Sequence, residues 1–356
     1  MFALVPDCHT AGRYRGVWQR HFYDGLIAAL PSVVLPREVD FEWARPAAHA
    51  SRGPSPARTE TSERLWDQIR AANEARALDA VISYCFAADL EPALVERTTA
   101  LGIPWINFFC DSTYAFDLVE GVARVASLNW FPEHAAAANY RALGRPSLCR
   151  PYAVAAVPDA SCRDAKHSLG FVGVPTGNRV FHLAGLALRG CVATVRGHGW
   201  RRTAPASRPR KGHDPRTQIG LAERLATSAL VRVIGRGAQP LADAELPDFL
   251  ASCRVVLGLN EGRDLDRVYR SYMKLRDIEL PGYGCCYLTQ HNEDVEHAFE
   301  IGREVMTFRT VGEAAAQIRR SVRDPARARE MGQAARRRVL AEHTWPARLG
   351  ELARAL

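Results

Sequence analysis

Short apolar segments alternate with amphipathic segments along most of the chain, and this alternation constrains the fold more than any other feature of the sequence. Repeated strand-then-helix units are typical of α/β proteins with parallel sheets. Strands are expected at residues 2–5, 80–83, 103–109, 148–152, 169–173, 192–195 and 254–260. Helices are expected at residues 18–30, 63–76, 131–143, 180–188, 246–252, 311–322 and 325–343, with a loop at 45–61.

The length of 356 residues allows two domains of ordinary size, each with its own core. A polar stretch at residues 158–167 separates two apolar regions, and the strand pattern starts again at 169–173. Domain boundaries usually fall in such polar stretches. We therefore expect an N-terminal domain over residues 1–160 and a C-terminal domain that begins at residue 161.

The composition is that of a globular protein, with 47% hydrophobic and 24% charged residues. No run approaches the ~20 consecutive apolar residues of a membrane helix, and the apolar start of the chain is too short for a secretory signal. We therefore expect a cytoplasmic protein. The nine cysteines include no C-x-x-C pair, so neither a zinc site nor a disulfide framework is indicated.

The net charge is +8, and basic residues concentrate in residues 196–216. Ala, Pro, Ser and Gly fill the spaces between them, so residues 197–212 are expected to form an exposed insertion. This segment could attract phosphate, an anionic lipid surface or nucleic acid, or it could be a solvated loop without a partner. Aromatic interleaving is limited to Trp200, which argues against a platform for stacking single-stranded bases.

Two cations and two carboxylates lie close together in residues 274–279, before an apolar strand. If this segment is helical, Lys274 and Asp277 share a face, and so do Arg276 and Glu279. A diphosphate needs charge-assisted donors and a ribose diol needs a strong acceptor, so the segment has the groups of a nucleotide-sugar site. The alternative is a helix with paired surface charges that ends at Pro281.

A second phosphate-binding pattern occurs at the start of the C-terminal domain. The expected strand at 169–173 ends in Gly173, and Asn178 and Arg179 open the following helix. Unpaired N–H groups at a helix N-terminus suit a diphosphate, and Arg179 would add a bidentate donor. The alternative is a turn in which Gly173 and Gly177 merely permit the bend.

The chain resembles the CgeB-like glycosyltransferases, the group that includes the spore maturation protein CgeB. That group has a pattern close to K-x-R-D-F-E-I-P-x-x-G before an apolar strand ending in Leu-Thr, and this chain matches it at residues 274–289, with Ile278 in place of Phe. Weaker matches lie at residues 171–179 and 342–345, and together they span residues 80–356.

The resemblance implies an α/β fold of the GT-B type, in which two Rossmann-like domains face each other across a cleft. It assigns residues 1–160 to the acceptor, residues 161–340 to the nucleotide-sugar donor, and residues 341–356 to a helix that returns to the first domain. Donor binding is expected from Gly173, Asn178, Arg179, Lys274, Arg276 and Glu279. Glu279 resembles the second glutamate of GT-B enzymes with paired glutamates and is the candidate for the ribose.

Two residues of the first domain are candidates for the catalytic base, because inverting transfer needs one near the acceptor hydroxyl. His9 lies in the first loop, and Asp111 follows an expected strand. His9 could instead be an ordinary surface residue, and Asp111 could cap the next segment. Asp264 and Asp266 have D-x-D spacing but no expected strand end beside them, so no metal site is expected.

These patterns predict a cytoplasmic, metal-independent glycosyltransferase that uses a UDP-, GDP- or dTDP-sugar as substrate and needs no further cofactor. The acceptor is not identified by the sequence, although the basic segment at 196–216 could recognise a phosphate-bearing one. One alternative is a GT-B-shaped sugar-nucleotide epimerase. Another is a non-catalytic module that binds nucleic acid or another polyanion through residues 196–216.

Overall fold

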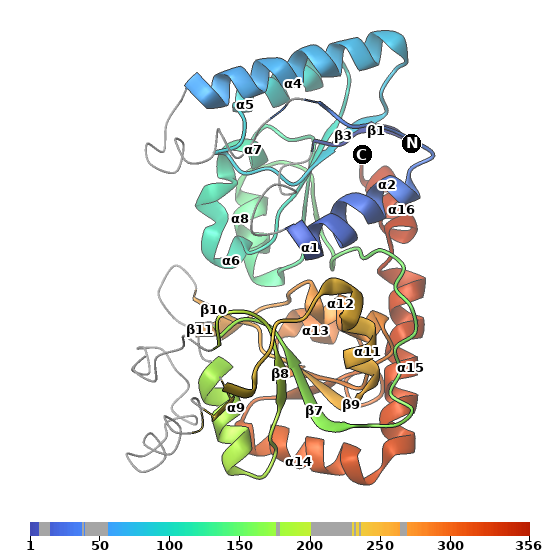
Figure 1. Cartoon of the computed structure of the whole chain (residues 1–356). Coiled ribbons are helices and arrows are strands. Elements are labelled where there is room, and N and C mark those ends of the chain that lie inside the picture. Colours follow the sequence, from blue (N-terminus) through green and yellow to red (C-terminus); the bar gives the residue numbers. More distant parts are fainter. Residues whose placement is uncertain are drawn as a thin grey trace. The chain divides into compact units, whose positions relative to one another are not determined.

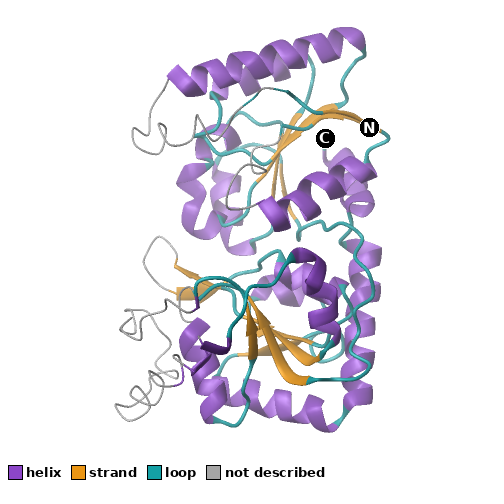
Figure 2. Cartoon of the chain, viewed as in Figure 1, coloured by secondary structure: helices purple, strands orange, loops and turns teal. Residues whose placement is uncertain are grey.

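Two α/β units make up the chain. The computed structural model describes residues 1–6, 15–37, 39, 56–175, 179–200, 230, 233–234, 236–263 and 269–356. The first unit contains Met1–Ala155 and His343–Leu356, and the second contains Ala156–Glu342. Both units have a parallel sheet accompanied by helices (Figures 1 and 2).

The sheet of the first unit has the strand order β2-β1-β3-β4-β5-β6, and every neighbouring pair is parallel. Its strands are β1 (Phe2–Leu4), β2 (Ser32–Val34), β3 (Ala80–Ser83), β4 (Trp105–Phe108), β5 (Leu128–Phe131) and β6 (Ser147–Cys149). The helices are α1 (Arg15–Trp18), α2 (Gly25–Ala29), α4 (Pro56–Ala75), α5 (Pro92–Ala100), α6 (Ser112–Ala115), α7 (Glu120–Ala123), α8 (Ala137–Ala142) and α16 (Trp345–Ala355). A π-helical segment, Gln19–Asp24, joins α1 to α2, and short 3₁₀ segments occupy Phe116–Leu118 and His134–Ala136.

Two expectations for the first unit were wrong. Residues 128–131 form β5, and Phe131 ends this strand instead of opening a helix. Residues 56–61 belong to α4 and not to a loop, because a proline at the first helical position begins a helix well. The predicted strand at residues 80–83 is confirmed as β3.

The C-terminal helix α16 packs within the first unit through an aromatic cluster. Trp345 is buried, its indole N–H donates to the main-chain oxygen of His21, and its ring lies edge-to-face against Phe22 at 5.2 Å and Trp130 at 5.6 Å. The last residues of the chain are therefore part of the core of the unit that contains its first residues.

The sheet of the second unit has the order β13-β12-β9-β7-β8, again all parallel. Its strands are β7 (His167–Val172), β8 (Thr194–Arg196), β9 (Cys253–Gly258), β12 (Tyr287–Gln290) and β13 (Met306–Phe308). The helices are α9 (Arg179–Leu188), α11 (Leu246–Ala251), α12 (Arg276–Gly282), α13 (Glu293–Ala298), α14 (Val311–Arg323) and α15 (Pro325–Glu342), with a 3₁₀ segment at Asp243–Glu245. Two further strands, β10 (Glu261–Arg263) and β11 (Tyr269–Ser271), form a separate antiparallel pair.

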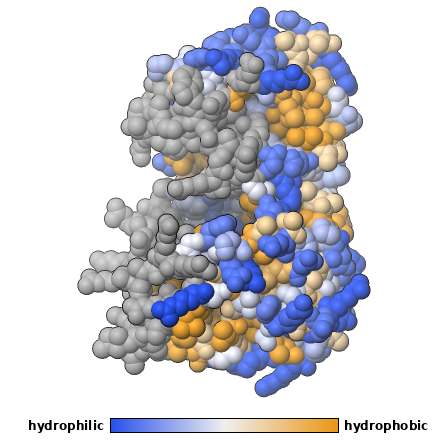
Figure 3. Space-filling model, viewed as in Figure 1, coloured by the Kyte–Doolittle hydropathy of each residue, from blue (hydrophilic) through white to orange (hydrophobic). Residues whose placement is uncertain are grey.

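The late helices of the second unit are amphipathic, as their sequences indicate. On α15 the buried residues include Ala328, Met331, Ala335 and Val339, spaced three or four residues apart. Arginine and glutamate residues occupy much of the opposite face, and hydrophilic residues predominate along this edge of the second unit in Figure 3. The apolar stripe therefore fixes α15 against the body of the unit.

Candidate functional site

Three of the residues predicted to bind a donor gather where the strand order of the second sheet reverses, namely Gly173, Arg179 and Arg276. The chain runs from β7 to β8 on one side and then returns to β9 on the other side of β7. Ligands of open parallel sheets bind outside the carboxyl ends of the strands at such a switch point. Gly173 follows β7 and Leu259 follows β9, and Arg179 links the two ends, because its guanidinium donates to the oxygens of Leu259 at 3.0 Å and Val174 at 3.1 Å.

Gly173 leaves room at this edge for a neighbouring guanidinium. Its φ is 155°, which favours glycine, and a Cβ atom there would lie 3.2 Å from Nη1 of Arg276. Its N–H donates to the oxygen of Arg196 at 2.9 Å, and its oxygen accepts from the indole N–H of Trp200 at 2.7 Å. Gly173 and Arg276, far apart in sequence, are therefore adjacent in the structure.

Arg276 is the first residue of α12, and its Nη1 donates to the oxygen of Val172, the last residue of β7, at 3.1 Å. Lys274 precedes the helix, with its ammonium 5.7 Å from the ring centroid of Tyr272. The structure thus brings Gly173, Arg179 and Arg276 to the ends of β7 and β9, and Lys274 lies two residues from Arg276. Guanidinium groups at one sheet edge can bind a diphosphate through charge-assisted hydrogen bonds.

Glu279 lies in the first turn of α12, three residues after Arg276, and is only 6% exposed. A carboxylate near a helix N-terminus is favourably placed in the helix dipole. The ribose contact expected of Glu279 stays a prediction. Two other predicted site residues, His9 and Asn178, lie outside the described residues, as do residues 201–216 of the basic segment.

The start of the basic segment differs from the exposed insertion that its sequence indicates. Trp200 is 3% exposed, and its ring lies 6.0 Å from Phe171 in an edge-to-face arrangement. The guanidinium of Arg196 lies 5.5 Å from the ring centroid of Phe249. Trp200 is therefore a packing residue beside Gly173 and not an exposed aromatic side chain.

Asp277 is the residue of the 274–279 motif whose role the sequence analysis missed. It is completely buried, and its carboxylate accepts hydrogen bonds from the Tyr287 hydroxyl (2.8 Å), the Thr289 hydroxyl (3.0 Å), the Asn260 side-chain amide (2.6 Å) and the main-chain N–H of Lys274 (2.7 Å). Buried polar groups normally have such partners. Asp277 therefore fixes the beginning of α12, the helix that carries Arg276.

The same network extends to the helix that carries Arg179. The main-chain N–H of Asn260 donates to the side-chain oxygen of Gln290 at 2.7 Å, and the Gln290 side-chain nitrogen lies 3.2 Å from Nε2 of His182 on α9. Buried hydrogen bonds between side chains rigidify the elements that they join. Both cation-bearing helices, α9 and α12, are thus anchored to one buried set of side chains.

Burial raises the pKa of Asp277, and the hydrogen bonds from Lys274, Tyr287 and Thr289 oppose this rise. A carboxyl group with a raised pKa keeps its proton in the native state at a pH where the unfolded chain has lost it. Its contribution to stability is therefore full below the ordinary pKa of 3.8 and declines as the pH rises above it.

We expect the free energy of unfolding of the wild type to fall relative to that of Asp277→Asn as the pH rises from about 4. Urea unfolding of both proteins over a pH series measures this difference. The two proteins share all other titrating groups, so the contributions of those groups to the free energy of unfolding cancel. If the free energy of unfolding of the wild type instead rises relative to that of Asp277→Asn with rising pH, the direction of the Asp277 pKa shift is wrong.

In the first unit, the predicted base Asp111 follows β4 and precedes α6. It is partly exposed and has a φ of 67° and a ψ of 18°. Among the described residues it is the sole non-glycine residue with a positive φ. Its main-chain N–H donates to a side-chain oxygen of Glu133, a residue that the sequence analysis missed.

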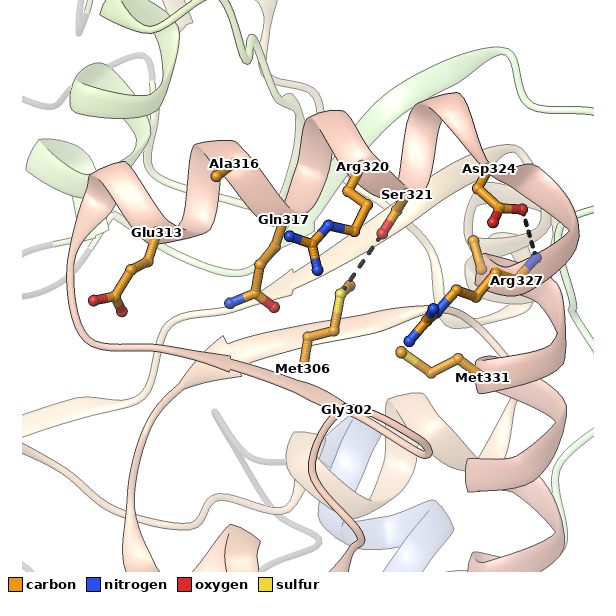
Figure 4. A pocket seen from close by; sticks show the side chains of 11 residues that line it. Gly302, Met306, Glu313, Ala316, Gln317, Arg320, Ser321, Asp324, Arg327 and Met331 are labelled. Carbon is orange, nitrogen blue, oxygen red and sulfur yellow. Dashed lines mark hydrogen bonds between the residues drawn. The ribbon is translucent and has the colours of Figure 1, made fainter.

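A pocket lies elsewhere in the second unit, between α14, α15 and the start of β13 (Figure 4). Its lining includes Met306, Arg320 and Met331, and the Ser321 hydroxyl donates to the sulfur of Met306 at 3.6 Å. Met306 is the first residue of β13, so this pocket lies at the amino edge of the sheet. None of the predicted site residues lines it.

Comparison with known proteins supports the predicted class of protein, that of the glycosyltransferases. Residues 186–354 match a family described as glycosyl transferase-like. Sucrose-phosphate synthase from Thermosynechococcus elongatus is similar in structure, with a TM-score of 0.60 and 14% identity over 99% of this chain and 98% of that chain. The HepE protein of Anabaena, solved with UDP, has a TM-score of 0.56 and 13% identity over 100% and 99% of the two chains.

A third similar structure is AviGT4, a glycosyltransferase involved in avilamycin A biosynthesis, with a TM-score of 0.53 and 14% identity over 99% of this chain and 96% of that chain. A search of curated proteins found no match. The structural likenesses confirm the GT-B fold, with its Rossmann-like parallel sheets. The family match confirms the predicted activity class: the protein is a glycosyltransferase.

Two further findings concern metals and membranes. In the described part of the chain, no three His, Cys, Asp or Glu side chains form a group that could hold a metal ion. Asp264 and Asp266, with their D-x-D spacing, lie outside that part. No helix formed by the described residues combines the length and the apolar character needed to cross a membrane.

Proposed function

We propose that the second unit binds the diphosphate of a nucleotide sugar with Arg179, Lys274 and Arg276. The observation that carries this proposal is the meeting of Arg179 and Arg276 at the ends of β7 and β9, where Gly173, which has no side chain, leaves space for the Arg276 guanidinium. Helix α9 begins at this edge and adds the positive end of its dipole. Glu279 accepts hydrogen bonds from the ribose, and Asn178 contributes an amide group beside the phosphates.

In this proposal the first unit supplies the acceptor side of the reaction, with Asp111 and His9 as candidates for the group that takes the proton of the acceptor hydroxyl. The transfer needs neither a metal ion nor a further cofactor, because cationic side chains neutralise the leaving diphosphate. The match to K-x-R-D-x-E-x-P in residues 274–281 supports placing the enzyme among the CgeB-like glycosyltransferases. We place it in the cytoplasm.

A UDP-sugar is the first donor class to test, because HepE, one of the similar structures, was solved with UDP-glucose. A ligand that binds only the native state raises its melting temperature. At a concentration of about 100 times its dissociation constant, the cognate nucleotide sugar is expected to raise the Tm by about 5–10 °C. A thermal-shift screen of UDP-, GDP- and dTDP-sugars measures this.

The screen also tests the alternatives. If no nucleotide sugar shifts the Tm, the proposed donor site is wrong. Product analysis with the donor alone separates the epimerase, which converts the sugar while it remains attached to the nucleotide, from a transferase, which releases the nucleoside diphosphate. Retention on polyanions without any nucleotide-sugar binding would favour the non-catalytic module.

A further inference from the structure

Two acidic residues meet at the carboxyl edge of the first sheet. Asp111 follows β4 and Glu133 follows β5, and these strands are parallel neighbours. The main-chain N–H of Asp111 donates to a carboxylate oxygen of Glu133. The two residues differ in access, because Asp111 is partly exposed whereas Glu133 is completely buried. Of the pair, only Asp111 can reach a ligand without a rearrangement.

The backbone of Asp111 is in the left-handed region, with φ at 67° and ψ at 18°. This conformation is disfavoured for residues that have a Cβ atom, although aspartate tolerates it better than most. Strained backbone persists only where the surroundings enforce it, and such residues cluster at functional sites. The conformation of Asp111 therefore needs an explanation from its neighbours.

Glu133 provides that explanation. Its carboxylate is taken out of water and needs donors, and the N–H of Asp111 reaches it in the observed conformation. Without this acceptor, residue 111 would gain by returning to the right-handed region at the start of α6, and the direction of its side chain would change. A charge-assisted hydrogen bond to a buried carboxylate is strong enough to outweigh the local strain.

The Asp111 side chain also has a hydrogen bond with Tyr114, the third residue of α6. Burial raises the pKa of Tyr114, and the charge of Asp111 and a hydrogen bond with its side chain raise it further. Cys110 and Glu133 also act on this hydroxyl in the same direction. The hydroxyl of Tyr114 thus remains protonated and can donate to the Asp111 carboxylate.

We infer that Glu133 is a positioning residue that holds Asp111 in its left-handed conformation, so that the Asp111 carboxylate meets the acceptor hydroxyl. This inference rests on the proposed function. In the transfer step the acceptor proton passes to Asp111, and the acceptor oxygen bonds to the anomeric carbon of the sugar. The bond from that carbon to the diphosphate breaks, and the diphosphate oxygen leaves with the electron pair.

The first test compares Glu133→Ala with Glu133→Gln. Glutamine keeps an oxygen that can accept from the N–H of Asp111, whereas alanine removes it. In crystal structures, residue 111 is expected to keep its positive φ in Glu133→Gln and to turn right-handed in Glu133→Ala. With UDP-glucose as donor and water as acceptor, release of UDP is expected to fall about 100-fold in Glu133→Ala and less than about tenfold in Glu133→Gln.

A second comparison tests the strain and needs no substrate. Asp111→Gly and Asp111→Ala both lack the carboxylate, but only glycine adopts the left-handed conformation readily. We expect Asp111→Gly to melt roughly 2–4 °C above Asp111→Ala. Equal melting temperatures would show that the conformation is not enforced.

The inference is also overturned if residue 111 stays left-handed in Glu133→Ala, or if Glu133→Gln loses as much turnover as Glu133→Ala while Asp111 is unmoved. Calorimetric titration with UDP-glucose distinguishes a failure of the inference about Glu133 from a failure of the proposed function. Affinity for the donor is expected to be the same in the wild type and in both Glu133 variants, because the donor residues belong to the second unit. A wild type whose Tm is raised by no nucleotide sugar in the thermal-shift screen would instead refute the donor site.

Discussion

Arg276→Ala is expected to weaken nucleotide-sugar binding about 10- to 150-fold. A hydrogen bond to a charged group contributes about 1.5–3 kcal/mol, and this range corresponds to that change in the dissociation constant. Arg276 is held at the end of β7 by its bond to Val172 and lies against Gly173, so alanine at this position removes a donor that is fixed at the proposed site. Isothermal titration calorimetry with the nucleotide sugar found in the thermal-shift screen measures the effect.

Two control variants sharpen this experiment. Arg320→Ala removes an exposed arginine from the pocket at the amino edge of the same sheet, and the donor affinity should be unchanged. Arg276→Lys keeps the charge but loses the planar fork that binds a phosphate through two parallel hydrogen bonds, so an intermediate loss is expected. If Arg276→Ala binds the donor as tightly as Arg320→Ala does, the diphosphate lies elsewhere.

The sequence was sufficient to predict β7 and β9 of the second sheet and the edge at which Gly173, Arg179 and Arg276 meet. Two segments about 100 residues apart contribute to this edge. One carries Gly173, which follows β7, and Arg179, which opens α9; the other carries Arg276, which opens α12. In parallel sheets the carboxyl ends of strands lie at one edge. Local pattern and this single rule therefore place the three residues together without any knowledge of their contacts.

Strand β5 shows where local pattern fails. Its sequence is Leu-Asn-Trp-Phe, and the polar Asn129 at its second position interrupts an apolar run. In the structure Asn129 is 1% exposed, and its side-chain amide donates to the main-chain oxygen of Ala123 at 2.9 Å. The acceptor that makes burial of this asparagine possible comes from helix α7, which the sequence alone does not place beside the strand.

Asp277 could not be assigned from the sequence for a related reason. Beside Lys274 and Arg276 it has the character of a surface charge. Its side-chain partners, however, are Asn260, which follows β9, and Tyr287 and Thr289 of β12. Gly258 makes this possible, because a Cβ atom there would lie 2.0 Å from the Tyr287 hydroxyl. The motif therefore combines one residue that supports the fold with others that face the site edge.

Asp277→Ala is accordingly expected to lower the free energy of unfolding of the second unit by about 3–5 kcal/mol. Loss of the carboxylate leaves the buried hydroxyls of Tyr287 and Thr289 and the N–H of Lys274 without this acceptor. Each buried donor that lacks an acceptor costs about 1–3 kcal/mol. Chemical denaturation followed by circular dichroism measures the change.

Matched variants separate this network effect from ordinary loss of a carboxylate. Tyr287→Phe removes one donor and leaves the others in place, so a loss of about 1 kcal/mol is expected. Glu330→Ala removes an exposed carboxylate from α15 and should change the stability by less than about 0.5 kcal/mol. If Asp277→Ala is no less stable than Glu330→Ala, the carboxylate does not anchor α12, and Asp277 would then have to be reconsidered as a residue that contacts the donor.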